Sequence, residues 1–200
     1  MLQKEKTLEE KIYLTWYEDG LIDIFTGVML LAIGVQMIVG LSYLMAIVGF
    51  LGLVWVKQTK QTVTDVRLGK ITFSAERLKA ISKLKRILVA FMFSAIAVGI
   101  IVRFMHDGTG ATPYPRALPI GIIMIVGMGL MARMIPLPRF SVYSLLLAGL
   151  MAVDVLLGYP LVYAFLVAGG IIVFMGTGDY SRFKDTYPIP QERDEEQDDE

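Results

Sequence analysis

Apolar residues gather in six long blocks along the chain, and short polar or Gly- and Pro-containing segments separate these blocks. Each block approaches the ~20 residues that an α-helix needs to cross the ~30 Å hydrocarbon core of a bilayer. The pattern therefore predicts an all-α, polytopic membrane protein with six transmembrane helices. The blocks are Leu21–Val39, Leu41–Val56, Ile87–Val102, Ala117–Ile135, Phe140–Leu157 and Tyr159–Gly176.

Tight turns are predicted where one block follows another closely. As a single helix, Leu21–Val56 would run about 54 Å at ~1.5 Å per residue, so it must turn back within the membrane. The corner is expected at Gly40 to Ser42. A second tight turn is expected at Gly158 to Pro160 on the same side, and a third at Pro136 to Pro138 on the opposite side.

Basic residues divide unequally between the two sides of the membrane that these blocks define. With the N-terminus in the cytoplasm, all of the nineteen Lys and Arg residues except Arg103 and Arg116 fall on the cytoplasmic side. Cytoplasmic segments of membrane proteins carry such an excess of Lys and Arg. We therefore predict a multi-pass protein of the cell (plasma) membrane with both termini in the cytoplasm (N-in/C-in).

The regions outside the blocks have their own character. Residues 1–20 are charged, and apolar positions spaced by four predict a short interfacial helix on the cytoplasmic surface, ended by Gly20. Residues 21–176 form the transmembrane domain, whose one sizeable loop, residues 57–86, is basic and cytoplasmic. Residues 177–200 form a cytoplasmic tail that ends in an acidic run.

Two local structures are expected within the basic loop. Thr62–Phe73 alternates weakly and is rich in Thr, Val and Ile, which favours a small β-hairpin. Ser74 is a suitable N-cap for a helix over Ala75–Arg86 that continues into the third block.

The composition supports the membrane class and excludes several kinds of site. Apolar residues make up 55% of the chain, against roughly 45–50% in soluble domains. The chain has no Cys and a single His, so we expect no disulfide, no thiolate nucleophile, no cofactor and no metal centre. No nucleophile–base or carboxylate pair has diagnostic spacing, which argues against an enzyme. Phe73 is the single aromatic residue of the basic loop, so we expect no nucleic-acid partner.

Asp154 is the most unusual single residue, because a carboxylate inside a membrane span is costly unless it is paired or hydrated. Arg103, Arg116 and Gln36 fall at a similar depth near the outer side, and His106 follows in the outer loop. One interpretation is a site for a proton, a cation or a small solute near the outer surface. The alternative is an ion pair of Asp154 with Arg103 or Arg116 that locks helices together, with His106 simply solvated.

Two carboxylates at the cytoplasmic rim form a second candidate group. Asp19 and Asp23 are four residues apart and face the same way if the first helix begins early. One interpretation pairs them with an arginine at the same rim, which is Arg86, Arg133 or Arg139. The alternative is that they only complement the positive end of a helix dipole.

The first and last pairs of blocks show a weak internal similarity. Aligning Gln36 with Asp154 also places Gly40 on Gly158 and aligns small residues in the block that follows each glycine. Parallel repeats of this kind occur in membrane proteins. The alternative is that two apolar hairpins align by chance.

Three cytoplasmic segments together carry a family resemblance: Tyr17–Asp23 (YEDGLID), Thr64–Phe73 (TDVRLGKITF) and Arg182–Pro188 (RFKDTYP). The chain resembles a family of small prokaryotic integral membrane proteins of unassigned function, with an Arg-x-Gly-x-x-x-Phe loop and an Arg-Phe…Tyr-Pro exit. Val66 and Lys70 depart from the Pro and Tyr that are usual in that loop. The resemblance implies no activity, but it points to six residues as a cytoplasmic interaction site: Arg67, Gly69, Phe73, Arg182, Phe183 and Tyr187.

We therefore expect an integral membrane protein of unassigned activity, a non-enzymatic module that engages lipid or a protein partner through its cytoplasmic face. Anionic lipid headgroups would bind the basic loop, at about 1 kcal/mol per Lys or Arg near the surface. The alternative is a small-solute transporter, or the substrate-binding subunit of one, that uses the outer polar group around Asp154. A homo-oligomer is compatible with either function.

Overall fold

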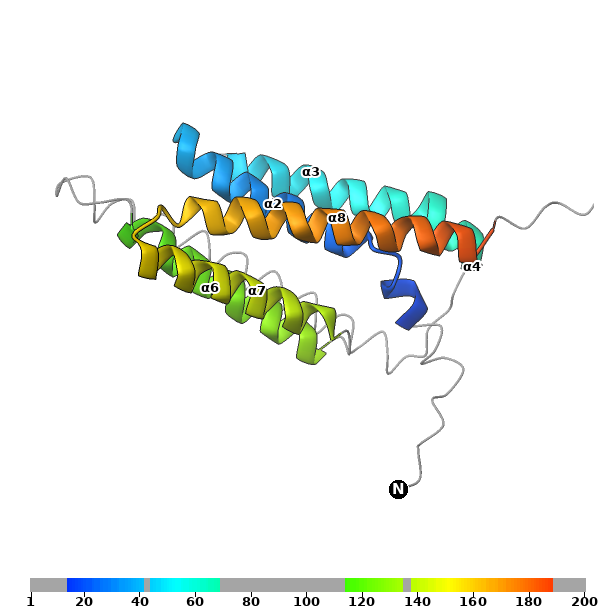
Figure 1. Cartoon of the computed structure of the whole chain (residues 1–200). Coiled ribbons are helices and arrows are strands. Elements are labelled where there is room, and N and C mark those ends of the chain that lie inside the picture. Colours follow the sequence, from blue (N-terminus) through cyan, green and yellow to red (C-terminus); the bar gives the residue numbers. More distant parts are fainter. Residues whose placement is uncertain (1–13, 42–43, 69–113, 135–137, 189–200) are drawn as a thin grey trace, which may run out of the picture.

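The computed structural model describes residues 14–41, 44–68, 114–134 and 138–188, and every regular element in these ranges is helical (Figure 1). A helical turn at residues 14–17 precedes the first long helix. The elements that follow are α2 (Leu21–Val39), α3 (Leu44–Thr59), the π-helical turn η1 (Lys60–Thr64), α4 (Asp65–Leu68), α6 (Tyr114–Met134), α7 (Arg139–Leu157) and α8 (Val162–Thr186). The third apolar block, Ile87–Val102, and the helix expected over Ala75–Arg86 lie outside the described residues.

Three helical segments are long and apolar enough to cross a membrane, judged by length and composition: Leu14–Val39, Arg139–Leu157 and Val162–Thr186. The first is not one straight helix, because Gly20 adopts a left-handed conformation (φ 73°) that separates residues 14–17 from α2. Leu118–Arg133 is a shorter apolar helix. The all-helical prediction is thus confirmed for the described residues, and membrane-spanning helices are present by these criteria.

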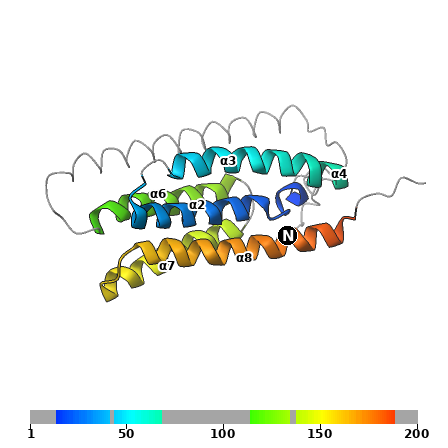
Figure 2. The ribbon, with the colours of Figure 1, turned by 90° about the horizontal axis from the view of Figure 1, so that it is seen from above.

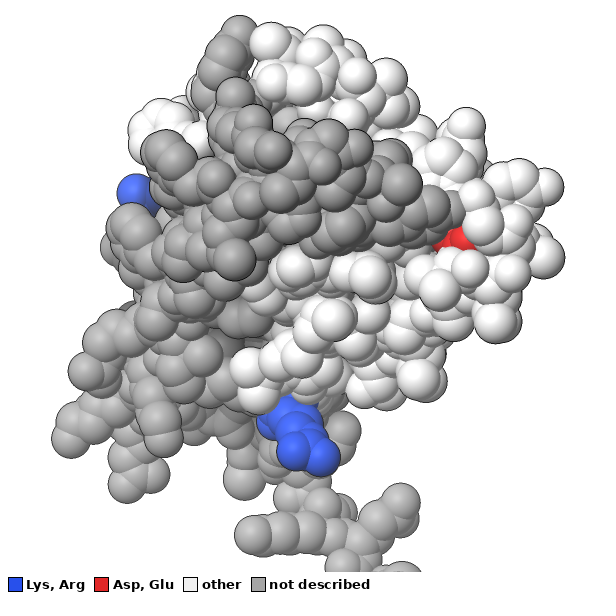
Figure 3. Space-filling view, turned by 90° about the vertical axis from the view of Figure 1, so that its left-hand side faces the viewer, with Lys and Arg blue, Asp and Glu red and all other residues white. Residues whose placement is uncertain are grey.

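The long helices run side by side, so the bundle has two distinct ends (Figures 1 and 2). At one end, here called the polar end, lie residues 14–17, η1 with α4, the end of α6, the start of α7 and the end of α8. At the other, here called the corner end, α2 gives way to α3 and α7 gives way to α8. Viewed from the corner end, the described surface shows few charged side chains (Figure 3).

Two glycines make the turns at the corner end, as the sequence predicts. Gly40 and Gly158 both have φ 75°, a left-handed conformation that costs glycine little. In each case the glycine N–H donates to the carbonyl of the residue four positions earlier, Gln36 or Asp154. The two positions that the internal alignment equates therefore share one helix-ending geometry. The turn expected at Pro136 lies outside the described residues.

Helices α2 and α8 pack against each other in antiparallel directions through glycines spaced seven residues apart. The glycines are Gly20, Gly27 and Gly34 at the start of and along α2, and Gly169 and Gly176 on α8. A Cβ on Gly27 would lie 2.8 Å from the Gly169 carbonyl oxygen, and a Cβ on Gly169 would lie 2.8 Å from the Gly27 carbonyl oxygen. Small residues of this kind allow two helix backbones to approach closely.

The core lies between α2, α6, α7 and α8, whereas the outward faces of these helices are apolar and exposed. Leu156 is 83% exposed and Phe174 is 81% exposed, far more than expected for large apolar side chains of a folded domain in water. Such a surface fits contact with lipid. The buried cluster includes Leu30, Ile33, Met128, Phe140, Tyr143, Leu147, Met151, Phe165, Ala168 and Ile172.

The hairpin predicted at Thr62–Phe73 is wrong for the part that the structure describes. The chain continues from α3 through η1 and α4 to Leu68 without leaving a helical path. The Thr-, Val- and Ile-rich pattern misled because Thr64 and Asp65 form hydrogen bonds with Asp19 and Trp16, tertiary contacts that override β propensity. Helix α8 also extends past Gly176 to Thr186, so the first part of the segment expected as a tail is helical.

Candidate functional site at the polar end

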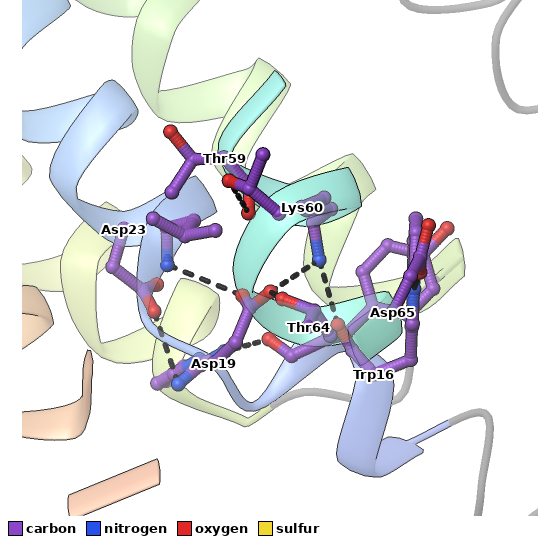
Figure 4. Close-up of polar contacts among 11 residues, drawn as sticks. Trp16, Asp19, Asp23, Thr59, Lys60, Thr64 and Asp65 are labelled. Atoms are coloured by element: carbon purple, nitrogen blue, oxygen red, sulfur yellow. Dashed lines mark hydrogen bonds and ion pairs between the residues drawn. The ribbon is translucent and has the colours of Figure 1, made fainter. Parts of the chain in front are cut away.

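Lys60 is buried at the polar end, where its side chain points toward Asp19 and Trp16 (Figure 4). Its Nζ atom lies 2.7 Å from Asp19 Oδ2 and donates a second hydrogen bond of 2.6 Å to the Trp16 carbonyl oxygen. The same ammonium lies 3.7 Å from the centroid of the Trp16 ring. An ammonium over an indole face is attracted by the negative charge of the ring, so Trp16 supplies both a carbonyl and a ring to one cation.

Both carboxylate oxygens of Asp19 accept hydrogen bonds. Thr64 donates from Oγ1 to Asp19 Oδ2 at 2.9 Å, and the Leu21 N–H donates to Asp19 Oδ1 at 3.2 Å. Asp19 and Thr64 are both fully buried. Buried charges persist in proteins when they are paired and hydrogen-bonded in this way. The group therefore fastens the end of α3 to the start of α2.

The π-helical turn places these groups. The Asp65 N–H donates to the Lys60 carbonyl, a bond across five residues that widens the turn between α3 and α4. Lys60 and Thr64 are one such turn apart, and both point to Asp19 (Figure 4). Asp65 then accepts a hydrogen bond from Trp16 Nε1 at 3.3 Å. Single π turns occur often at functional sites, so η1 is a candidate part of a functional site.

Burial lowers the pKa of Lys60, because loss of hydration disfavours the ammonium, and the Asp19 carboxylate opposes that shift. The Lys60 Nζ atom lies within ion-pair distance of Asp19 Oδ2, at 2.7 Å. Because removing one partner of a buried ion pair is strongly destabilising, the Lys60–Asp19 pair is a candidate for a structural role.

Arg139 connects three other segments at the same end of the bundle. From the first turn of α7, its Nη1 atom lies 3.0 Å from Asp23 Oδ2 on α2 and 3.1 Å from Asp179 Oδ2 on α8. Its Nη2 atom donates to the Tyr17 carbonyl oxygen. Of the two interpretations of the rim carboxylates, the structure shows pairing with an arginine for Asp23, whose partner is Arg139, whereas Asp19 pairs with Lys60. Asp23 is fully buried, and neither of its carboxylate oxygens forms a hydrogen bond with the described residues.

An open pocket of about 400 Å³ lies beside Arg139. Two arginines, two carboxylates and two aromatic side chains contribute to its wall. The lining residues are Thr15, Glu18, Pro138, Arg139, Asp179, Arg182, Phe183, Thr186 and Tyr187. They come from the segment before α2, from the start of α7 and from the last turns of α8, so the pocket depends on how these three segments meet.

The structure brings half of the predicted cytoplasmic interaction residues together in this pocket. Arg182, Phe183 and Tyr187 all line it, and the Phe183 and Tyr187 rings are in contact with centroids 5.1 Å apart. Arg67 lies on α4 instead, where its Nη1 atom donates to the Val63 carbonyl at 3.2 Å. Gly69 and Phe73 lie outside the described residues.

The outer candidate group is not assembled by the described residues. The Asp154 carboxylate accepts a hydrogen bond of 2.9 Å from the Ala164 N–H, so it caps the start of α8 across the corner. Gln36 lies on α2 one turn before its own corner, at the same end of the bundle. Arg116 falls in the first turn of α6, whose side chains are described from Leu118 onward. Arg103 and His106 lie outside the described residues.

Sequence reasoning missed Lys60, Thr64 and Trp16 as members of one polar group. Lys60 belongs to a basic loop whose charge is already explained by membrane topology, so nothing in the sequence separates it from its neighbours. A usable signal was the presence of Trp16 and Asp19 within four residues of Gly20, where the N-terminal helix is expected to end.

Within the described residues, no group of three or more His, Cys, Asp and Glu residues could hold a metal ion. Comparisons of the chain with protein-family models, with curated proteins and with solved structures find no match. The family resemblance therefore stays a prediction, and function is argued from the polar end itself.

Proposed function

We propose that the chain is a non-enzymatic, multi-pass module of the plasma membrane whose polar end faces the cytoplasm and engages lipid or a protein partner. The observation that carries this proposal is the open pocket at the polar end, where Arg182, Phe183 and Tyr187 meet Arg139. Arginine and aromatic side chains are enriched at binding sites because they combine large contact area with directed polar groups.

The distribution of basic side chains supports a cytoplasmic polar end. The Lys and Arg side chains that the structure describes belong to segments at that end: Lys57, Lys60, Arg67, Arg133, Arg139, Arg182 and Lys184. Together with the six apolar blocks, this distribution favours six spans with both termini inside. The absence of Cys makes the topology simple to test, since a single introduced Cys is the only thiol in the chain.

The topology test compares Tyr159→Cys at the corner end with Thr186→Cys at the polar end, both at exposed positions. In intact cells, a thiol reagent that does not cross membranes should label the first variant alone, and permeabilised cells should label both. Labelling of Thr186→Cys in intact cells would overturn the proposed orientation.

The function test is native mass spectrometry of the protein taken from its own host into nanodiscs at natural expression level. We expect a co-purifying lipid or protein that Arg182→Glu removes and that Lys184→Glu, two residues along α8 and outside the pocket lining, retains. Identical bound species in the wild type and in Arg182→Glu would contradict the proposal. The alternative, a small-solute transporter that uses the outer polar group around Asp154, stays a prediction.

A further inference from the structure

We propose that the pocket at the polar end binds a zwitterionic phospholipid headgroup, one that carries a phosphate next to a primary ammonium. The inference rests on the proposed function and names the ligand class of the same site.

The charges on the pocket wall point to a ligand with both signs of charge. Arg139 and Arg182 contribute two positive groups, and Glu18 and Asp179 contribute two negative groups. Among the described lining residues neither sign is in excess, and Asp179 is already paired with Arg139, so a purely anionic headgroup would leave the Glu18 carboxylate without a positive partner. A ligand with one phosphate and one ammonium can place each charge beside its opposite.

The pocket wall offers a ligand one positive and one negative side chain that are not already paired with another described residue. Arg139 is already engaged with Asp23, Asp179 and the Tyr17 carbonyl. Within the described part of the chain, neither Arg182 nor Glu18 forms an ion pair, and both are exposed. One free guanidinium suits a phosphate, which it can bind through two parallel hydrogen bonds. One free carboxylate suits an ammonium.

The aromatic side chains on the pocket wall also favour a headgroup that carries an ammonium. Phe183 and Tyr187 form a tilted ring pair on the pocket wall. Aromatic faces attract cations, and two lysines at the same end of the bundle already make this contact: Lys60 over Trp16 and Tyr17, and Lys184 over Tyr180. An ammonium brought in by a ligand would meet the same kind of surface.

The position of the pocket indicates that the headgroup belongs to a lipid rather than to a free solute. Val142 follows Arg139 by one helical turn on α7, and Met175 precedes Asp179 by one turn on α8. Both apolar side chains are exposed, at 55% and 43%. Acyl chains can therefore continue from the pocket along the exposed apolar surface of α7 and α8 while the headgroup stays among the polar side chains.

The experiment uses the full-length chain in nanodiscs made from equal parts of ethanolamine, choline and glycerol phospholipids. Native mass spectrometry then measures which lipids stay bound when the disc is removed. We expect enrichment of the ethanolamine lipid, because its ammonium can donate hydrogen bonds to a carboxylate whereas the quaternary choline group cannot. Preference for the anionic glycerol lipid in the wild type would overturn the inference.

Matched variants separate the two halves of the headgroup. Arg182→Gln should lower retention of all three phospholipids by roughly tenfold or more, because it removes the charge-assisted hydrogen bonds to the phosphate. Glu18→Gln should remove the preference for ethanolamine over glycerol lipid while total retention persists, and Lys184→Gln should change neither. An unchanged preference in Glu18→Gln, or tight binding of soluble phosphoethanolamine without lipid enrichment, would overturn the inference.

The outcome also separates this inference from the proposed function. If Arg182→Glu removes a host-derived partner but the nanodisc experiment shows no ethanolamine preference, the interaction face stands and the ligand class is wrong. If neither experiment finds a species that depends on Arg182, both proposals fail.

Discussion

Lys60 and Asp19 are 41 residues apart in the sequence, yet the Lys60 ammonium lies 2.7 Å from the Asp19 carboxylate with both side chains almost completely buried. The ion pair joins the end of α3 to the start of α2, and Thr64 adds a hydrogen bond to the same carboxylate. At the polar end, buried ion pairs therefore join segments that are distant in the sequence: Lys60 with Asp19, and the pocket residue Arg139 with Asp23.

Removing the Lys60 charge should strongly destabilise the protein. Lys60→Met leaves the Asp19 carboxylate buried without its counter-ion, and breaking a buried pair in this way costs roughly 3–5 kcal/mol. The measurement is unfolding in mild detergent titrated with SDS, followed by circular dichroism. Lys57→Met, at an exposed position one turn earlier, is the matched control and should change the free energy of unfolding by about 0.5 kcal/mol or less.

A double variant distinguishes loss of the pair from a general packing defect. Asp19→Asn combined with Lys60→Met should be less destabilised than the sum of the two single variants, by about 0.5–3 kcal/mol. Strict additivity would show that the two side chains do not interact as described.

Arg139 should be the second position at which loss of charge is severe. Arg139→Gln removes the partner of the fully buried Asp23, and we expect a loss of roughly 3–5 kcal/mol in the same unfolding measurement. Asp179→Asn should cost about 1 kcal/mol or less, because the Asp179 side chain is 34% exposed and solvent screens its pairing. Arg133→Gln, at an exposed position in the last turn of α6, serves as control. Equal effects of Arg139→Gln and Arg133→Gln would contradict the bridging role.

Two adjacent glycines of α8 should respond oppositely to alanine. A Cβ on Gly169 would meet the Gly27 carbonyl and Leu31, so Gly169→Ala should force α2 and α8 apart and cost about 1–3 kcal/mol. A Cβ on Gly170 meets nothing within 4 Å, so Gly170→Ala should be neutral or stabilising by up to about 1 kcal/mol, from helix propensity. Unfolding midpoints of the two variants test this directly. A loss of stability in Gly170→Ala as large as that in Gly169→Ala would contradict the described helix contact.

Asp154 should behave as a helix cap and not as a charged site. Asp154→Asn keeps a side-chain oxygen that can accept from the Ala164 N–H, so we expect a change of about 0.5 kcal/mol or less. Asp154→Ala removes the acceptor and should cost about 0.5–2 kcal/mol. Val155→Ala, at the next and exposed position, controls for the loss of side-chain volume. If Asp154→Asn were as damaging as Asp154→Ala, the negative charge itself would be required.

Much of the fold follows from the sequence because membrane helices can be recognised as long, predominantly apolar runs of residues. The block Leu21–Val39 coincides with α2, and both corner glycines end helices where the pattern places them. The pairing of Asp23 with Arg139 could also be anticipated, because the first and fifth apolar blocks are both predicted to begin at the cytoplasmic rim.

The inward position of Lys60 was not predictable from the sequence in the same way. A lysine in a basic loop is ordinarily a solvated charge, and its burial depends on a π-helical turn and on the path of residues 14–17. The role of Asp154 was hidden for a similar reason. Its partner is a backbone N–H of the next helix, and no side-chain pattern encodes a backbone donor.

The most direct test of the central claim places a photo-crosslinking amino acid at Thr186, which lines the pocket, or at Tyr159, which is exposed at the corner end. Irradiation of host cells followed by mass spectrometry identifies the lipid or protein attached at each position. The account predicts a specific adduct at position 186 that Arg182→Glu removes, and no matching adduct at position 159. Adducts confined to position 159, or an adduct at position 186 that persists in Arg182→Glu, would contradict the assignment of the polar end as the interaction face.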